Sequence, residues 1–435
     1  MIRVSTILVV VVALLVATSP HRGIAACSRD TYSTLPTAPV FPSTVLDAAS
    51  TPALSALVVN HWSEVAKMAR PAPFIPAANP VQTNCPHLTG NLVDFHSLGY
   101  AANQDITLPA NTRVLVSSCS VPTGTVYGKV TIPVGSELIF GDAVIHFQAR
   151  GVRVLGKLLA GSPTCRLRNK ITITLHGIRA AQTEDWLKAI QAVDGTVEIH
   201  GAQYAPTWTR LAKTISPGDD LIFIQDMVNW QPGQSILVTT TELKDSRDYN
   251  RNEERIISQV YRTSVHANVS AVRVTVPFTY KHYGGRAYQA EVALLSRNIV
   301  IQGDGTNSEP TDTANAVCVT AGDSTHPCND KYLTGFGAHV RIEGPQSIAR
   351  FQGVEWFRVG QTNVLGRYPL HFHMIGQAVT AGNLYVKDCS VHRSYFRAYA
   401  VHGTNKVVIS QNVAYDVIGH AYFLEDVSLF MSATT

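Results

Sequence analysis

The chain has 435 residues, of which 45% are hydrophobic, and it carries 35 basic against 31 acidic residues. Because no run of like charge occurs, the composition argues against nucleic acid as a partner. Apart from one run near the N-terminus, no apolar stretch approaches the roughly 20 residues that span a bilayer, so we expect no membrane span.

The first 26 residues have the layout of a secretory signal peptide. Arg3 precedes an apolar run from Ile7 to Val16, and Ala25-Ala26 supplies small residues for cleavage. We therefore expect a secreted protein that is extracellular or associated with the cell surface. Residues 27–91 are rich in Pro, Ala, Ser and Thr, and we interpret them as a stalk or linker.

The seven cysteines all follow the expected signal peptide. In an exported chain this odd number predicts up to three disulfides and one unpaired thiol. Cys318 and Cys328 flank a loop of Gly, Asp, Ser and Pro, and we expect these two to be bonded. Spacing leaves the pairing of the others open. The sequon at Asn268 predicts an exposed N-glycosylation site in a eukaryotic source.

Residues 92–200 are expected to form a β module that is punctuated by glycines. Very short apolar strands, such as Val130 to Ile132 and Leu138 to Phe140, are separated by glycine-containing turns. Turns at intervals of about five to ten residues leave no room for helices up to residue 178, and a helix remains an alternative only over Thr183 to Val193.

A repeat in the C-terminal half predicts a coiled arrangement of strands. Phe351 to Trp356, Val386 to Val391 and Ile409 to Ala414 share one pattern of apolar, polar and turn-forming residues. Val386 and Ile409 are 23 residues apart, which suits one coil of a parallel β-helix. The longer first interval leaves residues 366–376 as an insertion or an extra partial rung. We expect an all-β fold, with a right-handed parallel β-helix (solenoid) over 201–435 and the 92–200 module packed onto it.

Five of the sixteen histidines lie between residues 367 and 426. They are His371, His373, His392, His402 and His420. Apolar residues and imidazoles alternate over 369–374, so a strand there would place His371 and His373 on one face and Phe372 on the other. Stacked coils would bring the later histidines alongside, and this makes the segment the candidate functional surface.

The sequence also resembles a known family. Residues 106–177 resemble a G-eight domain, the glycine-punctuated module of large animal cell-surface proteins. Residues 201–260, 292–304 and 366–426 are similar to segments of the cell-migration-inducing hyaluronidase and its transmembrane relative. Fibrocystin-like proteins share the same modules. The resemblance implies an extracellular β-helix protein, and it implies Ca²⁺ as a cofactor because the hyaluronidase activity of the family is associated with calcium.

The chain departs from that family in two places. The tryptophan usually found early in the module is missing near Leu98 to Ala101, and relatives continue with more coils beyond Asp426. We therefore expect the β-helix to be truncated at its C-terminal end. This puts in doubt any activity that needs later coils.

The candidate surface has the chemistry to bind an acidic sugar. Guanidinium groups suit the carboxylate of a uronic acid, and imidazoles can position hydroxyl groups. The expected binding residues are Arg367, His371, His373, Arg393, Arg397, His402 and His420. The competing interpretation is that the arginines only solvate a sheet face.

Catalysis and metal binding are separate expectations for the same surface. Hydrolysis of a glycosidic bond needs an acid and a second carboxylate, for which Glu425 or Asp426 and then Asp416 are available. Alternatively, Asp416 and Asp426 satisfy backbone N–H groups in turns. His371 and His373 could hold a transition metal, or else form an imidazole ladder. Calcium prefers oxygen ligands, so the histidines would not be its site.

The leading hypothesis is a secreted β-helix protein that binds an extracellular acidic polysaccharide or glycoconjugate, such as hyaluronan. Binding is favoured over depolymerisation, and as an enzyme the chain would be an endo-acting polysaccharide hydrolase of hyaluronidase type. The alternative is a noncatalytic adhesion or receptor-type ectodomain, like fibrocystin-like proteins, whose histidine-rich coils are structural.

Overall fold

The computed structural model describes residues 38–46, 82–179, 185–242, 251–263, 269–285, 288–310, 334–378 and 380–425. Regular structure in these ranges consists of β-strands and two short 3-10 helices, η2 (Pro86–Leu88) and η3 (Phe95–Leu98). The all-β expectation is therefore confirmed. The expected signal peptide, Asn268, Cys318, Cys328 and Asp426 lie outside the described residues.

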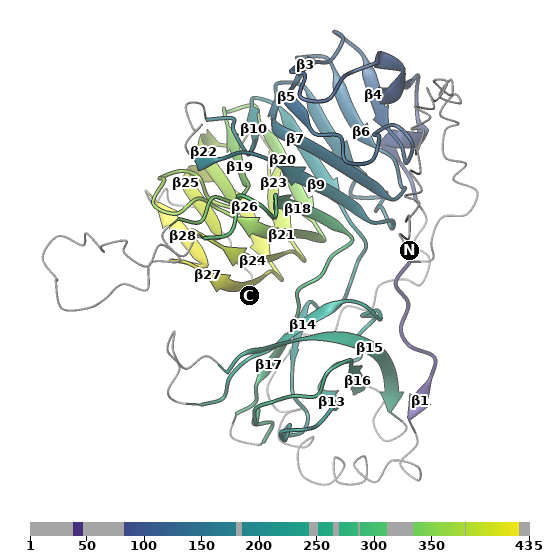
Figure 1. Ribbon diagram of the computed structural model, residues 1–435, viewed down its shortest axis with the longest axis vertical. Helices are drawn as coiled ribbons and strands as arrows, with labels where there is room; N and C mark the ends of the chain where they lie inside the picture. Colours follow the sequence, from purple (N-terminus) through teal and green to yellow (C-terminus); the bar gives the residue numbers. More distant parts are fainter. Residues whose placement is uncertain are drawn as a thin grey trace, which may run out of the picture.

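Most strands stack in three columns along one axis (Figure 1). The first column joins β2 (Val93–Asp94), β4 (Arg113–Val116), β6 (Glu137–Phe140), β8 (Lys157–Ala160), β11 (Thr196–His200), β20 (Ile348–Gln352), β23 (Leu384–Lys387) and β26 (Val407–Ser410). Neighbouring strands in this column are parallel throughout.

The other two columns share one sheet. The second column joins β3 (Ile106–Thr107), β5 (Tyr127–Ile132), β7 (Ile145–Val154), β10 (Ala189–Val193), β19 (His339–Glu343), β22 (Leu370–Gln377), β25 (Tyr399–Asn405) and β28 (Tyr422–Glu425). The third joins β9 (Ile171–Leu175), β18 (Ile299–Gly303), β21 (Val354–Val359), β24 (Ser390–Ser394) and β27 (Val413–Val417). The long strand β7 pairs with both columns. The expected parallel β-helix is confirmed.

The register agrees with the sequence repeat. Phe351 pairs with Val386, and Val386 pairs with Ile409, so each repeat is one turn of the solenoid. Strand β22 is a regular member of the second column between β19 and β25. It is therefore no extra rung, and residues 360–369 form a longer turn before it.

The expected 92–200 module is not a separate body packed onto the solenoid. Strand β8 pairs with β11, which pairs with β20, and β7 pairs with β10, which pairs with β19. One apolar core runs from Phe95 to Val407. Residues 93–200 thus form the first coils of the same solenoid, because their strands continue the same columns.

An inserted sheet interrupts one coil. It contains β12 (Trp208–Arg210), β13 (Leu221–Ile224), β14 (Ser235–Val238), β15 (Glu253–Thr263), β16 (Ser270–Val274) and β17 (Glu291–Leu294), all paired antiparallel, and β1 (Val45–Leu46) adds to β15 in parallel. The sheet lies between β11 and β18, whereas only Gly353 separates the equivalent β20 and β21. Figure 1 shows it below the coils. The strand pairing therefore defines a solenoid on both sides of an inserted sheet, whereas the sequence predicted one boundary at residue 201.

Covalent links are consistent with an oxidised chain that keeps one free thiol. Cys85 and Cys165 form a disulfide 80 residues apart, and Cys119 is also disulfide-bonded. Cys389 is free and buried, in agreement with the expected unpaired thiol. Within the described ranges, no helix is long and apolar enough to cross a bilayer.

Candidate functional site

The outward face of β19, β22, β25 and β28 carries the clustered histidines. Phe372 is buried in the core of the solenoid, so its neighbours His371 and His373 point away from that core, as the alternation predicts. Two rows result from the register. One row is Glu343, His373, His402 and Glu425, and the adjacent row is Arg341, His371, Ala400 and Phe423. We call these two rows the histidine face.

Three imidazoles of this face lie close together. The ring centroid of His371 is 4.9 Å from that of His373 and 6.0 Å from that of His402, and the last two are 5.1 Å apart. The rings of His371 and His402 are nearly parallel, at 6°. The stacking of coils therefore brings together side chains that are about one solenoid turn apart in sequence, as expected.

Charged side chains border the imidazoles. Arg341 Nη2 lies 2.8 Å from Glu343 Oε2 and 3.2 Å from His373 Nδ1. Glu425 Oε2 lies 4.0 Å from His402 Nδ1 at the other end of the row. Burial and the positive charge of Arg341 lower the pKa of His373, so this imidazole is neutral near pH 7. The face therefore places the neutral His373 ring beside the Glu343 carboxylate, and Glu425 lies at the other end of the row.

His371 is the most enclosed of the three. Its Nδ1 lies 2.9 Å from the carbonyl oxygen of Gly366, and a carbonyl only accepts, so Nδ1 carries the proton. The Nε2 atom then has a free lone pair, and it is buried without a hydrogen-bond partner in the described part of the chain. Burial lowers the pKa of His371 to about 3. This nitrogen is a neutral acceptor at physiological pH.

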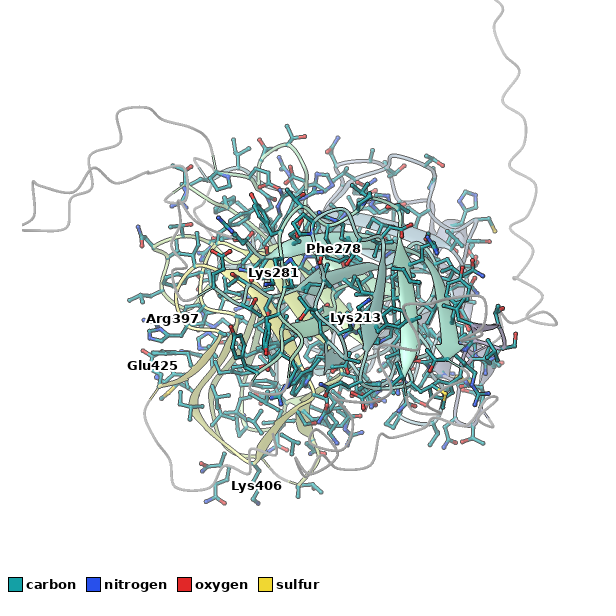
Figure 2. The ribbon with its side chains drawn as sticks, turned by 90° about the horizontal axis from the view of Figure 1, so that it is seen from below. Lys213, Phe278, Lys281, Arg397, Lys406 and Glu425 are labelled. Atoms are coloured by element: carbon teal, nitrogen blue, oxygen red, sulfur yellow. A yellow bond between two sulfur atoms is a disulfide. The ribbon has the colours of Figure 1, made fainter. Side chains whose placement is uncertain are left out.

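Three further expected binding residues lie at the edge of the histidine face. Arg367 Nη2 is 3.0 Å from Asp185 Oδ1. Arg397 stacks 3.7 Å from the ring centroid of Phe423 and donates to Tyr368 Oη at 3.0 Å. The His420 ring is 5.3 Å from the Phe423 ring. Figure 2 shows Arg397 and Glu425 on the same side of the molecule.

Arg393 and Asp416 belong to a different place. They lie on β24 and β27 of the third column and line a cavity of about 280 Å³. Asp416 and Glu425 therefore sit on different columns and have different neighbours. The expected pairing of these two carboxylates is not formed, because the outward positions of β27 and β28 belong to different faces of the solenoid.

The metal ligands that the sequence predicts on the histidine face are His371 and His373. Among the described residues, the group of potential ligands whose ligand atoms all lie within 4.8 Å is Cys85, His87 and Cys165. Its two sulfurs form the disulfide, so they are not available as thiolates. A transition metal at His371 and His373 stays a prediction, which the lone pair of His371 Nε2 supports.

Sequence reasoning missed Arg341 and Glu343, and it missed Asp185. Arg341 and Glu343 alternate with buried residues in His339–Glu343, which is the same signal that identified the histidines. Asp185 could not have been found in this way, because it lies in a turn outside the strands and its partner Arg367 is 182 positions away in the sequence.

The fold and the histidine face define a parallel β-helix protein with a polar outward sheet. Family models match a G8 domain over residues 97–212 and a CEMIP beta-helix over residues 335–429. These matches confirm the resemblance to the G8-domain β-helix proteins that the sequence indicated. The two matches cover early and late coils of one continuous solenoid.

Curated relatives agree with this assignment. A G8 domain-containing protein of Dictyostelium discoideum is 38% identical over 84% of this chain and 24% of its own length. Protein rliB of the same organism is 36% identical over 79% of this chain and 28% of its length. Human Fibrocystin-L is 31% identical over 68% of this chain and 7% of its length. The chain thus spans less than a third of each of these relatives.

One solved structure is also similar, the Gp54 tailspike of Acinetobacter baumannii bacteriophage AP22 in complex with a capsular saccharide. Its sequence identity is 9% over 83% of this chain and 54% of the tailspike chain, with a TM-score of 0.18. At this score the likeness carries no argument.

Proposed function

We propose that this chain is a secreted, extracellular β-helix protein that binds an acidic polysaccharide, such as hyaluronan, through the histidine face. The observation that carries the proposal is the in-register row of Glu343, His373, His402 and Glu425 beside the buried acceptor of His371. Imidazole nitrogens exchange hydrogen bonds with sugar hydroxyls, and Arg341, Arg367 and Arg397 supply forks for uronate carboxylates.

The geometry favours binding over cleavage. Neighbouring strands lie about 4.8 Å apart, so Glu343 and Glu425, three strands apart, are separated by about 14 Å along the sheet. Glycosidases that use two carboxylates hold them roughly 5 to 9.5 Å apart. The two acids of the row are too distant for that chemistry, and Asp416 lies on another column. We therefore propose binding as the function and treat cleavage as an outcome of the test.

The relatives support an extracellular setting for this proposal. They are G8 domain-containing proteins and fibrocystin-L, and the chain spans only part of each. Under the alternative, an adhesion or receptor-type ectodomain, the histidine face would be structural. The two proposals predict different results when the imidazoles are removed: loss of sugar affinity in the first, and loss of stability in the second.

The test compares two double variants of the full chain. His373→Ala with His402→Ala removes both imidazoles of the row, and His146→Ala with His176→Ala removes two outward imidazoles of earlier coils that bond to Thr174 and Gln148. Immobilised hyaluronan, alginate and neutral dextran are the probes. We expect the first double variant to lose at least about tenfold in hyaluronan affinity with an unchanged melting temperature, and the control to keep it.

The opposite pattern would support the structural alternative. If the His373→Ala, His402→Ala variant has a lower melting temperature and an unchanged hyaluronan affinity, the imidazoles stabilise the fold and do not bind the sugar. Equal binding to dextran would argue against an acidic ligand. Chain length of hyaluronan after incubation, with and without Ca²⁺, is measured in parallel by size exclusion, and shortened polymer would establish cleavage.

A further inference from the structure

A buried ion pair connects the second and third columns, apart from the histidine face. Lys188 directly precedes β10 of the second column, and Asp304 directly follows β18 of the third column. Lys188 Nζ lies 2.7 Å from Asp304 Oδ2, and the two side chains are 0% and 4% exposed. The inserted sheet lies between these two residues in the chain. The pair therefore brackets the insertion and has no access to solvent.

Packing and hydrogen bonds hold the amine of Lys188 against the carboxyl group. Nζ is also 3.2 Å from the Gly177 carbonyl oxygen, and it lies 5.3 Å from the ring centroid of the buried Phe336. The backbone N–H of Asp304 donates to the Leu175 carbonyl at 3.0 Å. Two groups that are kept in contact in this way react as if at a very high concentration. The fold thus supplies the proximity that a condensation of amine and carboxyl requires.

The two carboxylate oxygens of Asp304 have different surroundings. Oδ1 accepts hydrogen bonds from the backbone N–H of Asn307 at 2.7 Å, from the backbone N–H of Thr306 at 3.1 Å and from Asn307 Nδ2 at 3.2 Å. Oδ2 lies beside the Lys188 amine. Donors that converge on one oxygen stabilise negative charge that develops there, as in an oxyanion hole. Oδ1 is therefore placed to carry charge in a reaction at Cγ, while Oδ2 is placed to exchange protons with Lys188.

Burial makes the charged state of this pair costly. Desolvation lowers the pKa of the Lys188 ammonium, although the hydrogen bond and the charge of Asp304 oppose this shift. Burial would raise the pKa of Asp304, but the hydrogen bond and the charge of Lys188 hold it below its usual value. The pair therefore starts as an ammonium and a carboxylate. A neutral product would remove the cost of keeping both charges away from water.

We propose that Lys188 and Asp304 condense to an intramolecular isopeptide bond, which links the second and third columns covalently. The ammonium first gives one proton to Oδ2 across their contact. The neutral amine then attacks Cγ, the Nζ–Cγ bond forms, and negative charge develops on Oδ1 beside its three donors. A second proton passes from Nζ to Oδ2, the Cγ–Oδ2 bond breaks, and Oδ2 leaves as water. The reaction consumes no oxidant, reductant or second substrate.

The test is mass spectrometry of the full chain after its disulfides are reduced and any glycan is removed. We expect the wild type to lack the mass of one water molecule. Trypsin should not cleave after Lys188, and the digest should contain a branched peptide that joins Lys188 to Asp304. Lys188→Arg keeps the positive charge but has no amine to acylate, so this variant should have its full mass. The matched control is Lys157→Arg, which changes a half-exposed lysine paired with Glu137 and should keep the loss of water.

A wild-type chain of full mass that trypsin cleaves after Lys188 would overturn the proposal, and the pair would then be an ordinary buried ion pair. This readout needs no variant, so it holds even if Lys188→Arg folds poorly. Loss of water that persists in Lys188→Arg would also overturn the proposal, because the condensation would then lie elsewhere.

A third variant tests the role of Oδ1. Asn307→Ala removes the side-chain donor to this oxygen and leaves the backbone donors. We expect the bond to form at least about tenfold more slowly in this variant, as loss of an oxyanion donor predicts. The loss of water is followed over time in pulse-labelled protein. An equal rate in the variant and the wild type would contradict the assignment of developing charge to Oδ1.

Discussion

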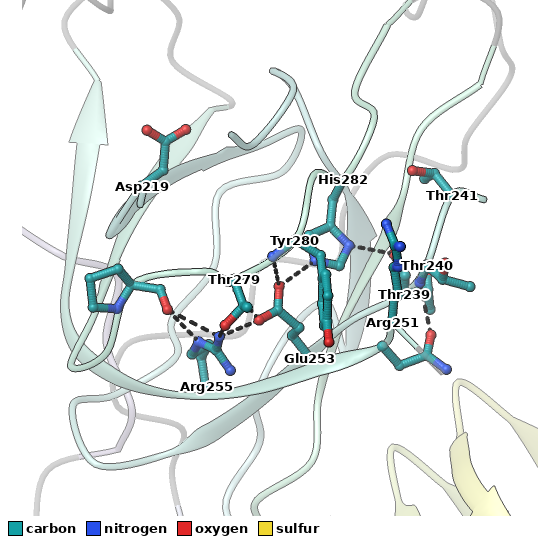
Figure 3. A network of polar contacts seen from close by, with 12 residues as sticks. Asp219, Thr239, Thr240, Thr241, Arg251, Glu253, Arg255, Thr279, Tyr280 and His282 are labelled. Atoms are coloured by element: carbon teal, nitrogen blue, oxygen red, sulfur yellow. Dashed lines mark hydrogen bonds and ion pairs between the residues drawn. The ribbon is translucent and has the colours of Figure 1, made fainter. Parts of the chain in front are cut away.

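A buried hydrogen bond between Glu253 and His282 lies within a polar network of the inserted sheet (Figure 3). His282 Nδ1 lies 2.9 Å from the Thr239 carbonyl oxygen and therefore carries a proton, and Nε2 lies 2.8 Å from Glu253 Oε2. Burial alone would raise the pKa of Glu253, but hydrogen bonds from His282 and from the backbone hold it below its usual value. The further donors to this carboxylate are Arg255 Nη2 and the backbone N–H groups of Thr279 and Tyr280.

Glu253→Gln should therefore destabilise the protein strongly. The substitution leaves His282 buried opposite an amide that cannot accept all four donors, and breaking a buried pair costs about 3–5 kcal/mol. The measurement is the free energy of unfolding in urea. Glu254→Gln is the matched control, because this neighbour is exposed and its change should stay within about 0.5 kcal/mol. Equal effects of the two changes would refute the role of the network.

The buried His371 predicts a pH dependence of stability. Its folded pKa of about 3 lies below the usual histidine value of 6.5, so the unfolded chain takes up a proton below about pH 6.5 and the native chain does not. The free energy of unfolding should therefore fall as the pH drops from about 6.5 towards 3, and His371 contributes up to about 1.4 kcal/mol per pH unit.

His371→Gln isolates this contribution. Burial lowers the pKa of His339 and His200 to about 3 as well, so the wild type loses stability through all three histidines as the pH falls. In the variant, the free energy of unfolding should depend less steeply on pH, by about one proton. Urea denaturation at intervals between pH 4 and 7 measures it. Identical slopes for the two proteins would mean that His371 is protonated in the native state.

At the scale of elements, the corner where the inserted sheet leaves the solenoid requires glycine. Gly201 follows β11, and a Cβ atom there would lie 2.3 Å from the carbonyl oxygen of Gly353, at the same corner of the next coil. Backbone atoms cannot move aside as a flexible side chain can. The first and third columns can therefore approach each other here only because both coils have glycine at this corner.

Gly201→Ala should lower the free energy of unfolding by about 1–3 kcal/mol, the usual cost of overpacking. Thermal unfolding followed by circular dichroism measures the loss. Gly305→Ala is the control, since this glycine has no positive φ and a Cβ there would meet only the end of the flexible Arg358 side chain. A variant at position 201 as stable as the control would show that the corner is more open than the structure indicates.

Sequence periodicity predicted the coils but not where they begin or what interrupts them. The repeat of Phe351, Val386 and Ile409 depends on local alternation and one fixed interval, and the structure pairs these residues. The inserted sheet could not be separated from the solenoid in this way, because its strands have the same apolar alternation. The histidine face was found from the alternation around His371 and His373. Asp185 could not be found from any local pattern, because it reaches the edge of this face only by its contact with the distant Arg367.

At the scale of the whole molecule, two apolar cores share one chain. The solenoid core runs from Phe95 to Val407, and the inserted sheet has its own core around Trp230 and Phe278. The fully buried Arg297 links them, since its Nη1 donates to the Leu294 carbonyl and its Nε to the Asp388 carbonyl. A small apolar cluster of Leu237, Ala293, Leu295 and Val413 also packs the inserted sheet against β27. This junction buries only four apolar side chains, far fewer than either core, and each large apolar side chain contributes about 1.5–3 kcal/mol.

The inserted sheet should therefore open without the solenoid when it is destabilised. In Glu253→Gln, hydrogen exchange read by mass spectrometry should rise in residues 208–294 and remain at the wild-type level in β22 and β25, because local opening exposes only the core that the variant weakens. Gly201→Ala should act on both parts, since its strain lies at their junction. A uniform rise across both cores in Glu253→Gln would show that the molecule unfolds as one cooperative unit. Arg297 and the apolar cluster around Val413 would then couple the two cores more strongly than their few contacts indicate.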